Sequence, residues 1–66
     1  MYTVIIFFSD GRQPWKWKKV VTLWKVKTWL DREGLQWLYF NVYDHTTGTY
    51  LRRVKPSDWV GAKVND

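Results

Sequence analysis

The pair Asp10-Gly11 separates two runs of strand-forming residues and directs the first part of the chain into a hairpin. Asp-Gly suits a two-residue type I′ turn, because both turn positions take positive φ angles. With this pair as the turn, Ser9 lies opposite Arg12, and opposed residues share a face of the sheet. The expected core face carries Val4, Ile6, Phe8, Trp15 and Trp17. The expected opposite face carries Thr3, Ile5, Phe7, Lys16 and Lys18.

The spacing of apolar residues predicts a helix over residues 22–33, although several residues there also favour a strand. Leu23, Val26 and Leu30 form one apolar stripe of that helix. Lysines near its start and carboxylates near its end oppose the helix dipole, at about 0.3 to 1 kcal/mol each. The stripe and the residues at the helix ends outweigh this cost. The alternative is a long strand in a five-stranded, SH3-like all-β barrel.

Both ends of the predicted helix carry residues that start or stop helices. Thr22 is the expected N-cap, and Val21 and Val26 are the expected pair of a hydrophobic staple around it. Gly34 is expected to adopt a left-handed conformation that ends the helix, with Leu35 folding back onto the last turn.

Alternating side chains after residue 34 predict a second hairpin. Residues 44–49 form its expected loop, which leads into a strand over residues 50–55. On the first strand, Leu38, Phe40 and Val42 are expected on the core side, and Trp37, Tyr39, Asn41 and Tyr43 on the other.

The apolar residues of this hairpin indicate its register. Pairing Asp44 with Thr49 places Leu51 opposite Val42 on the core side. The same pairing places Arg52 on the other side, away from the core.

These elements predict one α+β domain over residues 1–66, in which a small antiparallel sheet carries one helix on one face, in the order ββαββ. A chain of this length buries only about 60% of its unfolded surface. It has no Cys for disulfides and a single His. Aromatic packing or self-association is therefore expected to supply stability. A short turn at residues 57–59 is expected to return Trp59 to the domain.

The sheet face opposite the helix is too aromatic for an ordinary solvated face, which predicts a binding surface. Its aromatic rings suit stacking with unpaired bases, and its cations suit phosphates. Trp, Tyr and Arg also dominate protein interfaces, so composition does not separate the two functions. A sheet that curls around these rings would make them core instead. The expected binding residues are Lys16, Lys18, Trp37, Tyr39, Asn41, Tyr43, Tyr50, Arg52 and Arg53.

No arrangement in the sequence is typical of catalysis or metal binding. His45 lies in a turn-like segment, and Asp31 and Glu33 would point apart at a helix end. We expect no enzymatic activity, no cofactor and no metal. No apolar run is long enough to cross a bilayer and no export signal is recognised, so we expect a cytoplasmic protein without membrane contact.

The net charge of +5 favours an anionic partner. We therefore expect a non-enzymatic binding module, with single-stranded RNA or DNA as the first candidate ligand. The alternative is a protein-interaction module that uses the same face. It would act as a homodimer, or as a small inhibitor or adaptor that docks on the acidic surface of a partner protein.

Overall fold

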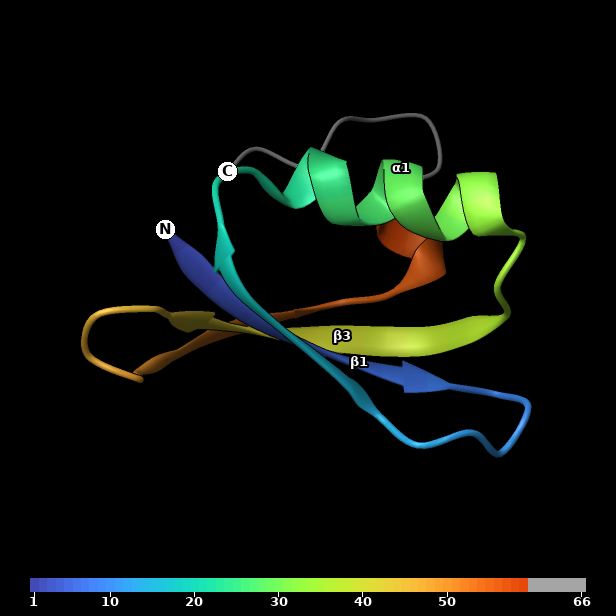
Figure 1. Ribbon diagram of the computed structural model, residues 1–66, viewed down its shortest axis with the longest axis horizontal. Coiled ribbons are helices and arrows are strands. Elements are labelled where there is room, and N and C mark those ends of the chain that lie inside the picture. The colour runs from blue at the N-terminus through green and yellow to red at the C-terminus, as the bar shows by residue number, and fades with distance from the viewer. Residues whose placement is uncertain (60–66) are drawn as a thin grey trace.

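In residues 1–59, which the computed structural model describes, four antiparallel strands form one sheet and one α-helix lies across one of its faces (Figure 1). In chain order the elements are β1 (Tyr2–Phe8), β2 (Trp15–Val20), α1 (Leu23–Glu33), β3 (Trp37–Asp44), β4 (Tyr50–Val54) and the 3-10 helix η1 (Pro56–Trp59). The strand order is β2-β1-β3-β4, so β2 and β4 are the two edges. The predicted α+β class and ββαββ order are confirmed. The sheet does not close, so the barrel alternative is wrong.

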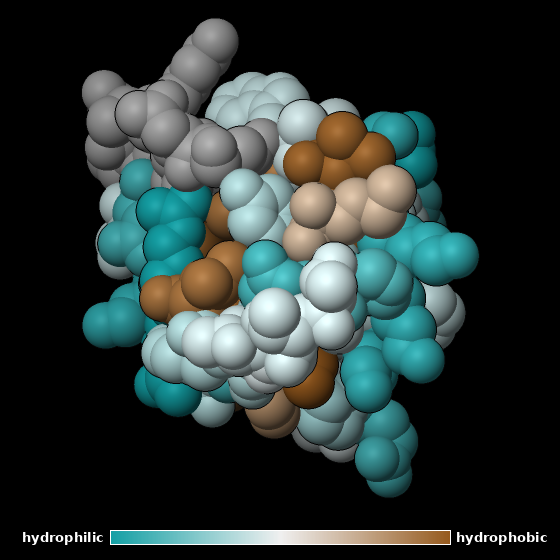
Figure 2. Space-filling view, turned by 90° about the vertical axis from the view of Figure 1, so that its left-hand side faces the viewer, coloured by the Kyte–Doolittle hydropathy of each residue, from teal (hydrophilic) through white to brown (hydrophobic). Residues whose placement is uncertain are grey.

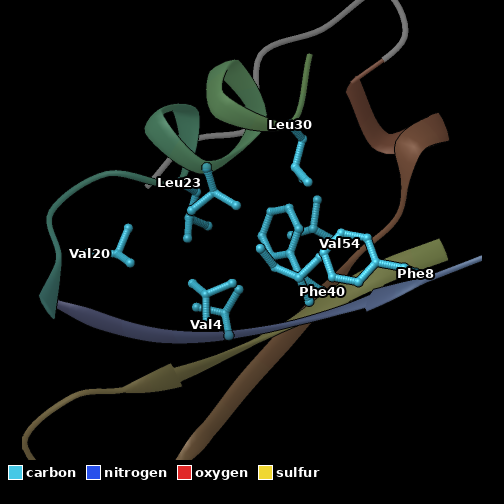
Figure 3. Close-up of a cluster of buried hydrophobic side chains, with 10 residues drawn as sticks. Val4, Phe8, Val20, Leu23, Leu30, Phe40 and Val54 are labelled. Atoms are coloured by element: carbon cyan, nitrogen blue, oxygen red, sulfur yellow. The ribbon is translucent and has the colours of Figure 1, made fainter. Parts of the chain in front are cut away.

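The core fills the space between α1 and the sheet (Figure 3). The predicted helix stripe is fully buried, and the strands contribute alternate residues because successive side chains point to opposite faces. Among the described residues no polar side chain is buried, so the core is stabilised by apolar burial. Its members are Val4, Ile6, Phe8, Val20, Leu23, Val26, Leu30, Phe40, Val42 and Val54.

Helix α1 begins after Thr22 without the predicted side-chain cap. The backbone of Thr22 is extended, as an N-cap requires, with φ −132° and ψ 146°, but its side chain makes no capping hydrogen bond. Val21 is 60% exposed, so it does not form the buried contact that a hydrophobic staple requires. Burial of Leu23 therefore holds the start of the helix.

Helix α1 ends as predicted, at a glycine in the left-handed conformation. Gly34 has φ 65° and ψ 28°. Its N–H donates to the carbonyl of Asp31 at 3.1 Å, and the N–H of Leu35 donates to the carbonyl of Leu30 at 3.1 Å. Leu35 also packs against the core. These bonds satisfy carbonyls that the helix itself leaves without donors.

The first hairpin has the predicted register but not the predicted tight turn. Ile6 pairs with Trp15, and Val4 pairs with Trp17. Toward the loop, the ladder stops at the pair Ile6–Trp15, because Pro14, the residue before Trp15, has no N–H to donate. The prediction of a two-residue turn is therefore wrong, and a longer loop joins β1 to β2.

Asp10 organises this loop. Its carboxylate accepts hydrogen bonds from Nε of Arg12 at 2.9 Å and from the backbone N–H of Arg12 at 3.2 Å. The side-chain bond is the main cause that lowers the pKa of the Asp10 carboxyl. The guanidinium of Arg12 also lies over the ring of Phe8, 5.3 Å from its centroid.

A bulge between β1 and β3 changes which side chains of β3 reach the core. The ladder shifts between Phe7 and Phe8, so that Phe8 pairs with Trp37. The ring of Trp37 lies 5.3 Å from that of Phe40, on the core side. Leu38 is 51% exposed. The predicted alternation is wrong at Trp37 and Leu38, because the bulge directs the larger side chain to the core.

A second bulge shifts the pairing of β3 with β4. Arg52, and not Leu51, lies opposite Val42. The shift places Val54 opposite Phe40, where Val54 is only 1% exposed. The predicted register would have put Val54 on the other face. The predicted register holds next to the loop, where Tyr43 pairs with Tyr50 and the N–H of Asp44 donates to the carbonyl of Thr49 at 2.8 Å. Beyond the bulge it is wrong, because burial of Val54 favours the shifted pairing.

The chain after β4 makes the predicted short turn, η1. The carboxylate of Asp58 accepts a hydrogen bond from the N–H of Lys55 at 2.7 Å. The side chain of Trp59 lies outside the described residues, so its predicted return to the domain stays a prediction. Within residues 1–59, no helix has the length and apolar character needed to span a membrane.

Candidate binding surfaces around strand β2

The sheet face away from α1, here called the outer face, carries most of the predicted binding residues. They are Lys16, Lys18, Tyr39, Asn41, Tyr43, Tyr50 and Arg53, beside Thr3, Ile5 and Phe7. Two predicted residues are not there. Trp37 packs against the core, and Arg52 lies opposite the buried Val42, on the helix side of the sheet. Their placement on the outer face is corrected accordingly.

The aromatic rings of the outer face contact one another. The centroids of Phe7 and Tyr39 are 4.9 Å apart, and those of Tyr43 and Tyr50 are 5.6 Å apart. The guanidinium of Arg53 lies 4.1 Å from the centroid of Tyr39. A base that stacked on this side of Tyr39 would have to displace that cation.

The amide of Asn41, another of the expected binding residues, also has a partner. Nε of Arg53 donates to Oδ1 of Asn41 at 3.1 Å.

On the side of the molecule where α1 begins, hydrophobic atoms form small groups between hydrophilic and pale ones (Figure 2). That side therefore shows no single broad apolar patch.

A shallow pocket of about 450 Å³ lies on the outer face, next to the loop between β3 and β4. Oγ1 of Thr3 and Nδ1 of His45 lie 3.0 Å apart, and the N–H of His45 donates to the carbonyl of Met1 at 3.2 Å. His45 thereby ties the loop to the start of the chain. The pocket is lined by Thr3, Ile5, Lys16, Lys18, Tyr43, Asp44, His45 and Gly48.

A larger hollow, of about 790 Å³, lies between β2 and α1 and is here called the β2–α1 groove. Every residue of β2 lines it, together with the start of α1 and one side of that helix. The lining residues are Trp15, Lys16, Trp17, Lys18, Lys19, Val20, Val21, Thr22, Trp24, Lys25, Thr28, Trp29 and Arg32.

The tryptophans of the groove divide into two pairs. Trp17 and Trp29 are half-buried, pack against the core and meet edge-on with centroids 5.5 Å apart. Trp15 and Trp24 are 54% and 47% exposed. The ring of Trp15 lies 6.0 Å from that of Trp29, which links the exposed ring to the packed pair. One pair therefore anchors the groove, and the other presents aromatic surface to solvent. Nζ of Lys27 lies 5.7 Å from the centroid of Trp24, so a base that stacked on that side of Trp24 would have to displace this amine.

The groove carries cations and, among its described lining residues, no Asp or Glu. The nearest acidic residues of α1 have cationic neighbours: Asp31 forms an ion pair with Lys27, and Glu33 lies 3.8 Å from Arg32. The surface around β2 therefore attracts anions. Its cations are Lys16, Lys18, Lys19, Lys25 and Arg32.

Sequence reasoning did not identify this groove. It assigned Trp15 and Trp17 to the core face, which is correct for their direction, and gave no binding role to Trp24. A signal is present, because Trp24, Thr28 and Arg32 recur every four residues and therefore share one side of the helix. Only the position of α1 above β2 shows that this side faces the edge strand.

In the described part of the chain, no group of three or more His, Cys, Asp or Glu side chains is placed to hold a metal ion. The chemistry of the surfaces around β2 is that of aromatic rings and cations. No family model, curated protein or solved structure matches the chain.

Proposed function

We propose that the protein is a non-enzymatic binding module that holds single-stranded nucleic acid in the β2–α1 groove. The observation that supports this proposal is the meeting of four tryptophans and five cations around one groove whose described residues include no carboxylate. Unpaired bases stack on aromatic rings, at roughly 1 to 3 kcal/mol per base, while Lys and Arg neutralise the phosphates between them. In a duplex the bases are already stacked, so single strands are the preferred ligand.

The exposed rings supply the stacking surface. Trp15 stands on β2 and Trp24 in the first turn of α1, and the packed ring of Trp29 supports Trp15 from below. Lys16 and Lys18 extend the positive charge from the groove onto the outer face. The predicted outer-face lysines therefore keep their role in this proposal.

Three other predicted residues lie at the opposite edge of the sheet and do not line the groove. Arg52 and Arg53 belong to β4, which is the opposite edge of the sheet from β2. Tyr50 lies on that same strand. Substitutions on β4 therefore serve as controls for substitutions in the groove.

Fluorescence anisotropy of labelled single-stranded RNA, single-stranded DNA and duplex oligonucleotides tests the proposal. We expect the single strands to bind more tightly than the duplex. If all five groove cations contact phosphates, the logarithm of affinity should fall against the logarithm of salt concentration with a slope of about −3.5. Absence of binding to every oligonucleotide at low salt would overturn the proposal.

A pair of variants locates the site. Trp24→Ala removes an exposed ring of the groove and should weaken binding of single strands roughly 5- to 150-fold, as expected for one lost stacking contact. The control Arg53→Ala, at the far edge, should change affinity less than about twofold, because a distant charge is screened by salt. A large effect of Arg53→Ala with none of Trp24→Ala would move the site to the outer face.

A further inference from the structure

The backbone N–H and C=O groups along the open edge of β2 can form hydrogen bonds, which nucleic-acid binding by the groove side chains does not use. β2 pairs with β1 on one side, and no other segment within residues 1–59 pairs with its second side. In an antiparallel strand, alternate residues direct their N–H and C=O groups away from the existing neighbour. Such an edge is a template for a further strand.

The two edges of the sheet differ in what lies beside them. The β2 edge runs along the β2–α1 groove, which has room for the side chains of an added strand. Both edges contain a bulge, near Lys19 in β2 and near Leu51 in β4, but the first half of β2 pairs regularly and adjoins the groove. The β2 edge is therefore the better template.

The side chains of β2 define what an added strand would carry. Trp15 and Trp17 point to the helix side, so apolar residues of the added strand would enter the groove beside them. Lys16 and Lys18 point to the outer face, where Asp or Glu of the added strand would pair with them. The matching sequence alternates acidic and apolar residues.

The same lysines disfavour a second copy of this chain. Two β2 strands side by side would place lysines against lysines, and like charges directly opposed are destabilising. The ladder also shifts in the second half of β2, where Lys19 has φ 59°. A bulge and edge lysines are common protections against self-pairing. Neither the bulge nor the lysines would prevent an acidic strand from pairing with the first half of β2.

We propose that the β2 edge accepts an acidic, extended segment of a partner protein as a fifth strand, with its apolar residues in the β2–α1 groove. The proposal goes beyond nucleic-acid binding and does not depend on it. Both ligands would occupy the groove, so each should exclude the other.

Backbone methylation of a peptide tests strand addition directly. The probe is a labelled peptide in which Glu alternates with Val, and two derivatives carry N-methyl groups on one or the other alternate set of amides. Only one set faces β2 in an added strand. We expect the unmethylated peptide and one derivative to bind, and the other derivative to bind at least tenfold more weakly. Equal affinities of the two derivatives, high or low, would overturn the proposal.

A charge exchange tests the assigned register. The double variant Lys16→Glu/Lys18→Glu should lose affinity for the Glu-Val peptide at least tenfold and gain affinity for a Lys-Val peptide. The control Arg53→Glu, at the other edge, should leave both affinities nearly unchanged. If the double variant still binds the acidic peptide as wild type does, the register is wrong.

Competition separates this proposal from the previous one. A single-stranded oligonucleotide should displace the bound peptide from the wild-type protein. If oligonucleotides bind but neither the peptide nor its derivatives do, the fifth strand is overturned and nucleic-acid binding stands. If the peptide binds with the expected methylation pattern and no oligonucleotide binds, nucleic-acid binding is overturned and the fifth strand stands.

Discussion

Trp37 and Leu38 exchange the positions that simple alternation assigns to them. The shift between Phe7 and Phe8 turns Trp37 toward Phe40 and leaves Leu38 51% exposed. The exchange is favourable because a tryptophan ring removes more apolar surface from water than a leucine side chain does. A residue expected to contact a ligand therefore stabilises the fold.

We expect Trp37→Ala to lower the free energy of unfolding by about 2 kcal/mol, because loss of a partly buried ring removes apolar burial and leaves a cavity. The matched variant Leu38→Ala should change it by less than about 0.5 kcal/mol, as at other exposed positions. Urea unfolding followed by circular dichroism measures both. Equal losses in the two variants would contradict the exchange of positions.

One carboxylate organises the loop from β3 to β4, as Asp10 organises the loop from β1 to β2. Oδ1 of Asp44 accepts hydrogen bonds from the N–H groups of Thr46 and Thr47, each at 2.9 Å. The bond from Thr47 is the main cause that lowers the pKa of Asp44 from its usual 3.8. Gly48, at φ 75°, adopts the left-handed conformation in which the chain returns to β4.

The lowered pKa gives the loop a defined response to acid. Because the folded pKa of Asp44 lies below the unfolded one, its charge contributes stability above about pH 4, which is lost as the pH falls through the folded pKa. We expect Asp44→Asn to lose less stability than wild type between about pH 6 and about pH 2. Thermal unfolding at both pH values measures the difference. An NMR-titrated pKa of 3.8 or higher for Asp44 would contradict the expectation.

Over the whole molecule, both edge strands of the sheet carry cations: Arg52 and Arg53 on β4, and Lys16, Lys18 and Lys19 on β2. The net charge is +5, and the β2 edge has the sequence WKWKKV, in which lysines alternate with exposed or half-buried tryptophans. The lysines of two such edges would repel each other, while the exposed backbone and tryptophans beside them favour pairing. Charge is therefore expected to keep the protein monomeric.

We expect the wild-type protein to sediment as a monomer at low and moderate salt. The double variant Lys16→Thr/Lys18→Thr should self-associate, because threonine favours strands and removes the repulsion between edges. Sedimentation velocity over a range of protein concentrations measures both. A wild-type dimer at low salt, where repulsion is strongest, would refute the protective role of these lysines.

The elements with local causes follow from the sequence alone. The pairs Ile6–Trp15 and Val4–Trp17, the buried helix stripe and the helix stop at Gly34 are present as predicted. Each depends on side-chain periodicity or on the conformational freedom of one glycine. The predicted outer-face lysines are placed correctly for the same reason, because alternation along β2 is regular as far as Lys18.

Only the tertiary structure decided the groove and the two bulges of β3, one toward β1 and one toward β4. These two bulges exist because Trp37 and Val54 pack against the core, and periodicity within one strand cannot express that gain. The β2–α1 groove exists because the helix crosses above an edge strand, which brings Trp15 and Trp29 together from separate segments. The residue types were determined by the sequence, and their meeting around one edge was determined by packing.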